Sequence, residues 1–141
     1  MRQRRRPKWI AGRVVSRVVL DTSAIVAAIK SEAGADRVRS IATGAVVSAL
    51  TVGELASVLT REGVPPHVVE AVVDEFRFVV EPFDRMRALA AGFLIAKTAQ
   101  RGMSLGDRAC LALAIELGLP VLTADRAWRG LDVGIEINFI R

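Results

Sequence analysis

From residue 17 onward, the sequence alternates short runs of β-branched residues with longer segments of helical periodicity. Such alternation predicts an α/β architecture, in which a parallel sheet is covered by helices on both faces. The predicted strands are residues 17–20, 45–48, 79–81, 120–123 and 136–140. The predicted helices are residues 23–30, 32–42, 51–62, 65–78, 84–101, 104–118 and 126–131. No repeat, linker or low-complexity tract interrupts these elements, so residues 17–141 are predicted to form a single domain.

One predicted helix, residues 104–118, is apolar on nearly every side and carries the only cysteine, Cys110. Such a helix is expected between the sheet and other helices, because no face of it suits water. A lone cysteine excludes an internal disulfide and favours a cytoplasmic protein, and Cys110 is predicted to be a small core residue. No apolar run approaches the roughly 20 residues that a membrane-spanning helix needs, so no membrane segment is predicted.

The net charge of +5 comes from the first part of the chain. Residues 1–17 contain seven of the 20 basic residues and no acid, which leaves 13 basic and 15 acidic residues elsewhere, a net charge of −2. Residues 1–16 therefore form a basic extension ahead of the domain. Three interpretations stay open: an arm that binds phosphates by counterion release, a disordered leader, or upstream sequence translated from an early start codon.

Four acidic residues fall at or near points where the predicted elements change. They are Asp21 at the end of the first strand, Glu54 after the second, Asp107 early in the helix from residue 104, and Asp125 after the fourth strand. In an open parallel sheet, ligands bind beyond the carboxyl ends of the strands, where the strand order reverses. Asp21 and Asp125 would share that edge if their strands are neighbours.

Each acid taken alone has an ordinary explanation as a helix cap. Thr51–Glu54 and Ser104–Asp107 have the spacing of a capping box, and Asp21 and Asp125 can each be an N-cap. Capping does not require the four acids to meet. Metal binding does, so the distances between the carboxylates distinguish the two explanations.

Gathering the four carboxylates has an electrostatic cost that a cation removes. Two carboxylates about 5 Å apart repel by roughly 3 kcal/mol at an effective dielectric near 20, and no Lys or Arg is placed in the sequence to pair with all four. Oxygen ligands suit Mg²⁺ or Mn²⁺, whereas one Cys and one His give no usual zinc ligand set. A carboxylate cage that keeps positions for water suits phosphoryl chemistry, in which the metal activates the water.

In this interpretation Asp21 and Asp107 are the first-choice metal ligands. Asp125 would hold a second metal or position the first, and Glu54 would be a ligand or orient the water. The number of metals stays open. Thr123, two residues before Asp125, is placed to hydrogen-bond a carboxylate or a water.

Two arginines and the only histidine are further candidates for functional groups. Arg108 and Arg126 directly follow acids, so each is a candidate contact for a substrate phosphate, with a solvent-facing or ion-paired arginine as the alternative. His67 lies at a predicted helix start and outside any Gly-x-Ser-x-Gly motif, so it is predicted to face solvent. A Ser-His-Asp hydrolase is therefore not indicated.

The order of these segments resembles the PIN-domain family, and within it the VapC-type toxins of type II toxin–antitoxin systems. The resemblance spans about residues 17–140, and its last two motifs are the most specific. The motifs are Val-Leu-Asp-Thr-Ser at 19–23, Glu-Leu at 54–55, Ser-Leu-Gly-Asp-Arg-Ala-Cys-Leu-Ala-Leu-Ala at 104–114, and Leu-Thr-Ala-Asp-Arg-Ala-Trp at 122–128.

The resemblance implies a three-layer α/β/α fold around a parallel five-stranded sheet in the order 3-2-1-4-5, with the strand of Asp21 beside that of Asp125. It also implies a Mg²⁺- or Mn²⁺-dependent endoribonuclease that is commonly a homodimer and is inhibited by a VapB-like antitoxin. The acidic positions of the family correspond to Asp21, Glu54, Asp107 and Asp125. Such toxins usually begin within a few residues of the first strand, so the 16 residues ahead of it here depart from the pattern.

A different class of function stays open, namely a PIN-fold module that binds RNA or a protein without cutting. Apolar helices at residues 24–29 and 68–73 predict either a groove for an antitoxin segment or ordinary core faces. The sequence does not indicate which RNA would be cut. Aromatic residues make up only 5% of the chain, which weighs against recognition of bases by stacking.

Overall fold

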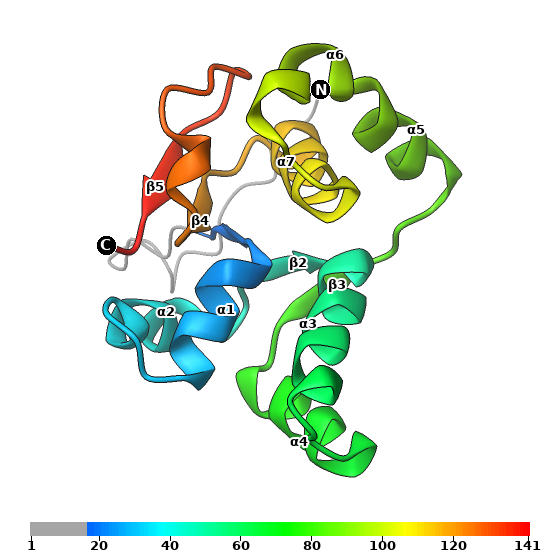
Figure 1. Cartoon of the computed structure of the whole chain (residues 1–141). Coiled ribbons are helices and arrows are strands. Elements are labelled where there is room, and N and C mark those ends of the chain that lie inside the picture. Colours follow the sequence, from blue (N-terminus) through cyan, green and yellow to red (C-terminus); the bar gives the residue numbers. More distant parts are fainter. Residues whose placement is uncertain (1–16) are drawn as a thin grey trace, which may run out of the picture.

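The computed structural model describes residues 17–141, and in it five parallel strands form one sheet between two layers of helices (Figure 1). The strand order is β3-β2-β1-β4-β5, and each neighbouring pair is parallel. The strands are β1 (Val19–Leu20), β2 (Val46–Ser48), β3 (Val79–Glu81), β4 (Val121–Thr123) and β5 (Ile137–Phe139). The predicted fold class and strand order are confirmed. The predicted basic extension, residues 1–16, lies outside the described part of the chain.

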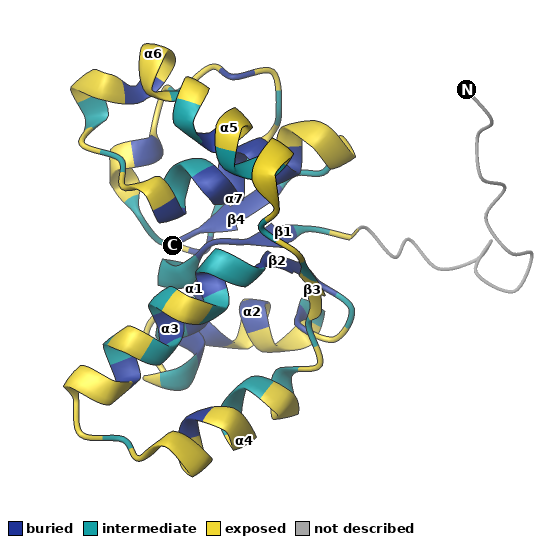
Figure 2. Cartoon of the chain, turned by 90° about the vertical axis from the view of Figure 1, so that its right-hand side faces the viewer, coloured by how far each residue is buried: buried dark blue, intermediate teal, exposed yellow. Residues whose placement is uncertain are grey.

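The helices fall into two groups, one on each face of the sheet (Figures 1 and 2). The first group is α1 (Thr22–Ile29), α2 (Ala35–Ile41), α3 (Ala49–Arg61) and α4 (Pro66–Phe76). The second group is α5 (Arg85–Phe93), α6 (Ile95–Thr98), the short 3-10 helix η2 (Ala99–Arg101) and α7 (Leu105–Leu117). A further 3-10 turn, η3 (Arg126–Trp128), lies between β4 and β5 in the chain.

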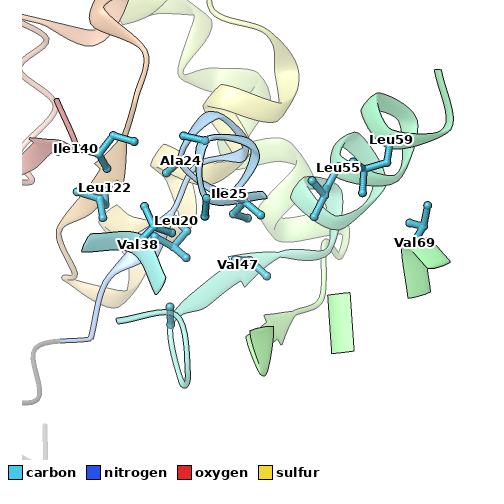
Figure 3. Close-up of a cluster of buried hydrophobic side chains, with 13 residues drawn as sticks. Leu20, Ala24, Ile25, Val38, Val47, Leu55, Leu59, Val69, Leu122 and Ile140 are labelled. Atoms are coloured by element: carbon cyan, nitrogen blue, oxygen red, sulfur yellow. The ribbon is translucent and has the colours of Figure 1, made fainter. Parts of the chain in front are cut away.

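Alternate strand residues supply the two hydrophobic cores, because successive side chains of a strand point to opposite faces. Leu20, Val47 and Leu122 pack with α1 to α4 in one cluster, part of which Figure 3 shows. Their neighbours Val19, Val46 and Val121 pack against α7 in the other cluster. The three central strands are thus buried on both faces, which explains why their sequences are continuous apolar runs rather than alternating ones.

Local sequence sets the ends of α3 and α7. Ser104 and Asp107 form the predicted capping box of α7, with each side chain accepting the other residue's backbone N–H at 3.1 and 3.0 Å. The predicted box at Thr51–Glu54 is wrong, because α3 begins earlier: Ser48 is its N-cap and accepts from the backbone N–H of Leu50 at 3.2 Å. Glu54 is therefore free of a capping role.

The predicted long helix over residues 84–101 is wrong, since this segment is divided into α5, α6 and η2. Gly92 weakens the helix just before the break, and Leu94 connects α5 to α6. The break lets the Leu94 side chain pack against both the α7–sheet cluster and the small cluster around Ala91. Tertiary packing thus overrides the continuous helical pattern of the sequence.

The apolar helix α7 lies against the sheet, as predicted, with residues 109–114 buried. Its two ends differ from the prediction, because Leu105 is 45% exposed and Ile115 is 39% exposed. Within residues 17–141, no helix has both the length and the apolar character needed to cross a bilayer.

Candidate metal centre at the carboxyl edge of the sheet

Asp21 follows the central strand β1 directly and is almost fully buried, at 2% exposure. It occupies the N-cap position of α1, but its side chain makes no capping hydrogen bond. Instead, Asp21 Oδ2 accepts hydrogen bonds from Ser23 Oγ at 2.6 Å and from Thr123 Oγ1 at 2.9 Å. The prediction that Thr123 hydrogen-bonds a carboxylate is thus confirmed. These two hydrogen bonds orient the Asp21 side chain, which does not cap α1.

The two hydroxyls that hold Asp21 are themselves oriented by the chain after β4. The backbone N–H of Ala124 donates to Ser23 Oγ at 2.9 Å, and that of Asp125 donates to Thr123 Oγ1 at 3.0 Å. Each hydroxyl therefore accepts from a backbone amide and turns its own proton toward the carboxylate. Charge-assisted bonds of this kind are stronger than neutral ones. This network fixes Asp125 beside Asp21, and Ser23 is a member of it that the sequence analysis missed.

Glu54 reaches the same edge from α3 and is seated against the first turn of α7. Thr22 Oγ1 donates to Glu54 Oε1 at 2.9 Å. The seat exists because residue 106 is glycine: a Cβ there would lie 2.1 Å from Glu54 Cδ, far inside contact distance. Thr22 and Gly106 were both missed by the sequence analysis. A glycine in the first turn of an apolar helix is the signal that could have revealed the seat, because glycine disfavours helix.

Asp107 and Asp125 approach the edge from α7 and from the end of β4, and both also serve as caps. Asp107 is part of the α7 capping box, and Asp125 Oδ1 accepts from the backbone N–H of Ala127 at 2.9 Å. The capping interpretation therefore holds for these two acids and fails for Asp21 and Glu54.

Three of the four carboxylates have raised pKa values, and a neighbouring acid contributes to each increase. Burial raises the pKa of Asp21 from 3.8 to about 6, with further increases from the charges of Asp107 and Glu54. Burial also raises the pKa of Glu54, and the charge of Asp107 adds to this. The pKa of Asp107 is raised by burial and by Asp125.

The charge of Arg108 lowers the pKa of Asp107, so this concentration of negative charge is partly offset at that acid. Among residues 17–141, none of the four acids forms a salt bridge. As the side chains are placed, no three potential ligands in that part of the chain converge closely enough to hold one ion together. A cation at this edge would therefore be held directly by one or two carboxylates and by waters, a mode of binding that Mg²⁺ uses. An all-oxygen donor set without a salt-bridge partner fits a hard divalent cation.

The predicted accessory groups have separate outcomes. Arg108 Nη1 donates to the backbone carbonyls of Ala91 at 3.1 Å and Gly92 at 3.4 Å, so its guanidinium is engaged by the end of α5. The Nε of Arg108 is also buried, so this guanidinium is enclosed by the protein and is not presented to a substrate phosphate. Arg126 is exposed, directly after Asp125. Burial raises the pKa of the Cys110 thiol well above its usual value, as expected for a neutral core residue.

Fold and site define a class of protein: a parallel α/β domain with carboxylates gathered where the strand order reverses, between β1 and β4. The chain belongs to the PIN-domain family, since the family model of the PIN domain matches residues 18–134. The predicted family is thereby confirmed. No match was found among curated proteins.

Solved structures share the fold over nearly their whole length. A DNA-bound VapBC from Salmonella typhimurium matches with a TM-score of 0.68 and 24% identity, covering 89% of this chain and 99% of that one. VapBC2 from Rickettsia felis, bound to a promoter DNA fragment, matches with a TM-score of 0.64 and 16% identity, covering 85% and 96%. A toxin–antitoxin complex from Klebsiella pneumoniae matches with a TM-score of 0.61 and 16% identity, covering 81% and 92%. At these identities the likeness establishes the fold alone.

Proposed function

We propose that this protein is a Mg²⁺- or Mn²⁺-dependent endoribonuclease and the toxin of a toxin–antitoxin pair. The proposal depends on the buried Asp21 at the strand-order switch, whose pKa the charges of Asp107 and Glu54 raise further, with Asp125 acting on Asp107 in turn. Among the described residues, none of these four acids forms a salt bridge. Membership of the PIN-domain family supports a nuclease. Structural neighbours that are VapBC complexes support a toxin with a VapB-like antitoxin. The single cysteine favours a protein that acts in the cytoplasm.

In this proposal Asp21 and Asp107 are the main metal ligands, and Asp125 and Glu54 complete the site. A divalent cation bound there supplies an activated water and stabilises charge on the attacked phosphate. Ser23 and Thr123 keep Asp21 in one orientation, so the ligand needs little reorganisation. Glu54 Oε1 already accepts the hydrogen bond from Thr22 Oγ1. We therefore assign Glu54 Oε2 to orient the attacking water and accept its proton. Burial raises the pKa of Glu54, which makes its carboxylate a stronger base for that transfer.

For the antitoxin we propose the surface between α1, α2 and α4. Within the predicted apolar helices, Ala24 and Ile25 are core residues, while other residues of α1 and α4 line a cavity of about 360 Å³. The apolar lining residues of that cavity are Ala28, Ile29, Ala42, Val72 and Phe76. Val72→Glu should place a charge in this cavity and abolish inhibition of the enzyme by the antitoxin. Inhibition that survives Val72→Glu would rule this surface out.

For the homodimer we propose the apolar face of α5 and α6. Met86 is 78% exposed, Phe93 is 72% exposed and Ile95 is 53% exposed. Arg87, beside Met86, is already paired within the protomer, since it bonds both Glu81 and Glu116. Its charge therefore does not oppose contact between two copies. Light scattering should give a dimer for the parent and a monomer for Met86→Lys/Phe93→Lys; an unchanged mass would exclude this face.

A metal-titrated cleavage assay tests the function. RNA cleavage by the purified protein should depend on Mg²⁺ or Mn²⁺ and fall by at least about 100-fold in Asp107→Asn, because loss of a direct ligand should cost more than loss of its supporting residues. Asp132→Asn is the matched control, since it removes the same charge at an exposed position away from the site.

Three outcomes would change the proposal. Equal cleavage by the parent and Asp107→Asn would remove the catalytic assignment. A parent that binds RNA without cutting it would support the non-cleaving PIN-fold module instead. Cleavage of DNA in preference to RNA would redirect the substrate class.

A further inference from the structure

Arginines gather at the end of β5, one strand away from Thr123. The guanidinium carbon of Arg129 lies 5.8 Å from the centre of the Phe139 ring, and Arg37 Nη1 donates to the Phe139 carbonyl at 3.0 Å. Phe139 is the register partner of Thr123, which bonds Asp21. Adjacent strands are about 4.8 Å apart. Both arginines are therefore next to the candidate metal centre and on one side of it.

Two more arginines extend this group toward Asp125. Arg126 follows Asp125 directly and is exposed. Arg101 donates through Nη1 to the carbonyls of Ala127 and Arg129, which ties η2 to the segment after η3. In Figure 1 the orange turn after β4 lies beside β5. We call Arg37, Arg101, Arg126 and Arg129 the β5 strip.

The charge of the β5 strip is available for a partner. Among the described residues, none of its four arginines forms a salt bridge. Arg61, Arg77 and Arg85 form none either, so the strip differs from them by its position next to the site. Hydrogen bonds to backbone carbonyls leave a guanidinium fully charged and with further N–H donors. At the opposite edge of the sheet, β3 ends at Glu81, whose carboxylate is paired with Arg87. Unpaired positive charge therefore lies on the β5 side of the site.

This asymmetry matters because the site itself repels polyanions. A phosphodiester that approaches the four acids needs cations close by, and arginine binds phosphate oxygens with two parallel N–H donors. Phe139 already lies beneath Arg129, so the strip presents guanidinium groups rather than an open aromatic ring. Contacts of that kind position a nucleic-acid backbone without reading its sequence.

We propose that single-stranded RNA runs along the β5 strip, with its backbone passing from the scissile bond at Asp125 over Arg129 toward Arg37. This inference rests on the proposed function and adds the direction in which the bound RNA backbone extends from the metal centre. RNA on the β3 side would meet no comparable set of unpaired arginines at the strand ends.

A binding experiment with matched charge changes tests the path. A fluorescent 12-nucleotide RNA is titrated into full-length protein carrying Asp21→Asn, in EDTA, so that cleavage plays no part. Arg37→Gln/Arg126→Gln/Arg129→Gln removes three charges from the strip. Arg61→Gln/Arg77→Gln/Arg85→Gln removes three exposed charges elsewhere. The basic residues 1–16 are present in every protein and contribute equally.

The strip variant should bind the RNA at least about tenfold more weakly than its parent. The slope of log K against log salt should fall by about 2 in magnitude, since each lost phosphate contact in a single strand contributes about 0.7. The control variant should change affinity less than about threefold. Equal losses in the two variants would overturn the proposal.

Two further arms keep the result interpretable. Because Arg37 bonds the end of β5, melting temperatures are compared, and if the triple variant unfolds, Arg126→Gln/Arg129→Gln is tested against Arg61→Gln/Arg77→Gln. Polyglutamate that displaces the RNA at equal charge concentration would overturn the RNA assignment in favour of an acidic protein partner. A parent that cuts no RNA, yet loses binding only in the strip variant, would refute the proposed function and leave this path standing.

Discussion

Asp21→Asn should make the metal-free protein more stable at neutral pH, although Asp21 is the residue most central to the proposed chemistry. Burial raises the pKa of Asp21 from 3.8 to about 6, so the folded state binds this proton more tightly than the unfolded state does. That stabilisation is fully present below about pH 4 and is lost as the pH rises through 6. At pH 7 the buried carboxylate is ionised, which forgoes up to about 3 kcal/mol. Asparagine is neutral, and its carbonyl oxygen can still accept from Ser23 and Thr123.

Urea unfolding in EDTA at several pH values checks this result. Asp21→Asn should exceed the parent by about 1–3 kcal/mol at pH 7, and the difference should shrink toward zero near pH 4. Asp132→Asn, at an exposed position, should show no such trend. An Asp21→Asn protein that is less stable than the parent at pH 7, or a difference independent of pH, would contradict the assignment of this carboxylate as buried and electrostatically strained.

Gly106→Ala should reduce RNA cleavage by at least about tenfold while changing stability by less than about 1 kcal/mol. The new Cβ would lie 2.1 Å from Glu54 Cδ, so the carboxylate must leave its seat and its bond from Thr22. The Glu54 carboxylate is the end of a flexible side chain, so it can move away at little cost in stability. Alanine also favours helix over glycine by about 1 kcal/mol, which offsets the lost hydrogen bond.

Gly53→Ala is the matched control for this substitution. Gly53 lies in α3 directly before Glu54, and a Cβ there would have no atom within 4 Å. It should raise the unfolding free energy slightly and leave cleavage unchanged. Equal cleavage by Gly106→Ala and the parent would show that the position of Glu54 does not matter for the reaction. A large loss of stability would show that Gly106 is needed for packing instead.

The fold was predictable because its signals are local and repeated. Apolar runs such as Val19–Leu20 and Val121–Thr123 are bounded by polar residues, and both strands are buried on both faces. The division of residues 84–101 was not predictable in this way. It depends on where Leu94 packs in three dimensions, whereas the sequence there has an unbroken helical pattern.

The site was predictable for the acids but not for the residues that hold them. Asp21 and Asp125 follow strands that the alternation already identified, and Thr123 lies close to Asp125 in the chain. Ser23 accepts from the backbone after β4, and Gly106 makes room for Glu54 on α3, so both roles depend on contacts distant in sequence. The glycine in the first turn of α7 was the only local signal of its role, and nothing local indicated that of Ser23. Asp107 caps α7, and its pKa is also raised by Asp125, so its capping role does not exclude the proposed metal role.

We expect these carboxylates to bind a divalent cation, and a titration with Mn²⁺ followed by electron paramagnetic resonance measures that binding most directly. The parent and Asp132→Asn should bind Mn²⁺ alike, with affinity rising between about pH 5 and 7 as Asp21 loses its proton. Asp21→Asn and Asp107→Asn should each bind at least about tenfold more weakly. Equal Mn²⁺ affinity in all four proteins would contradict the account.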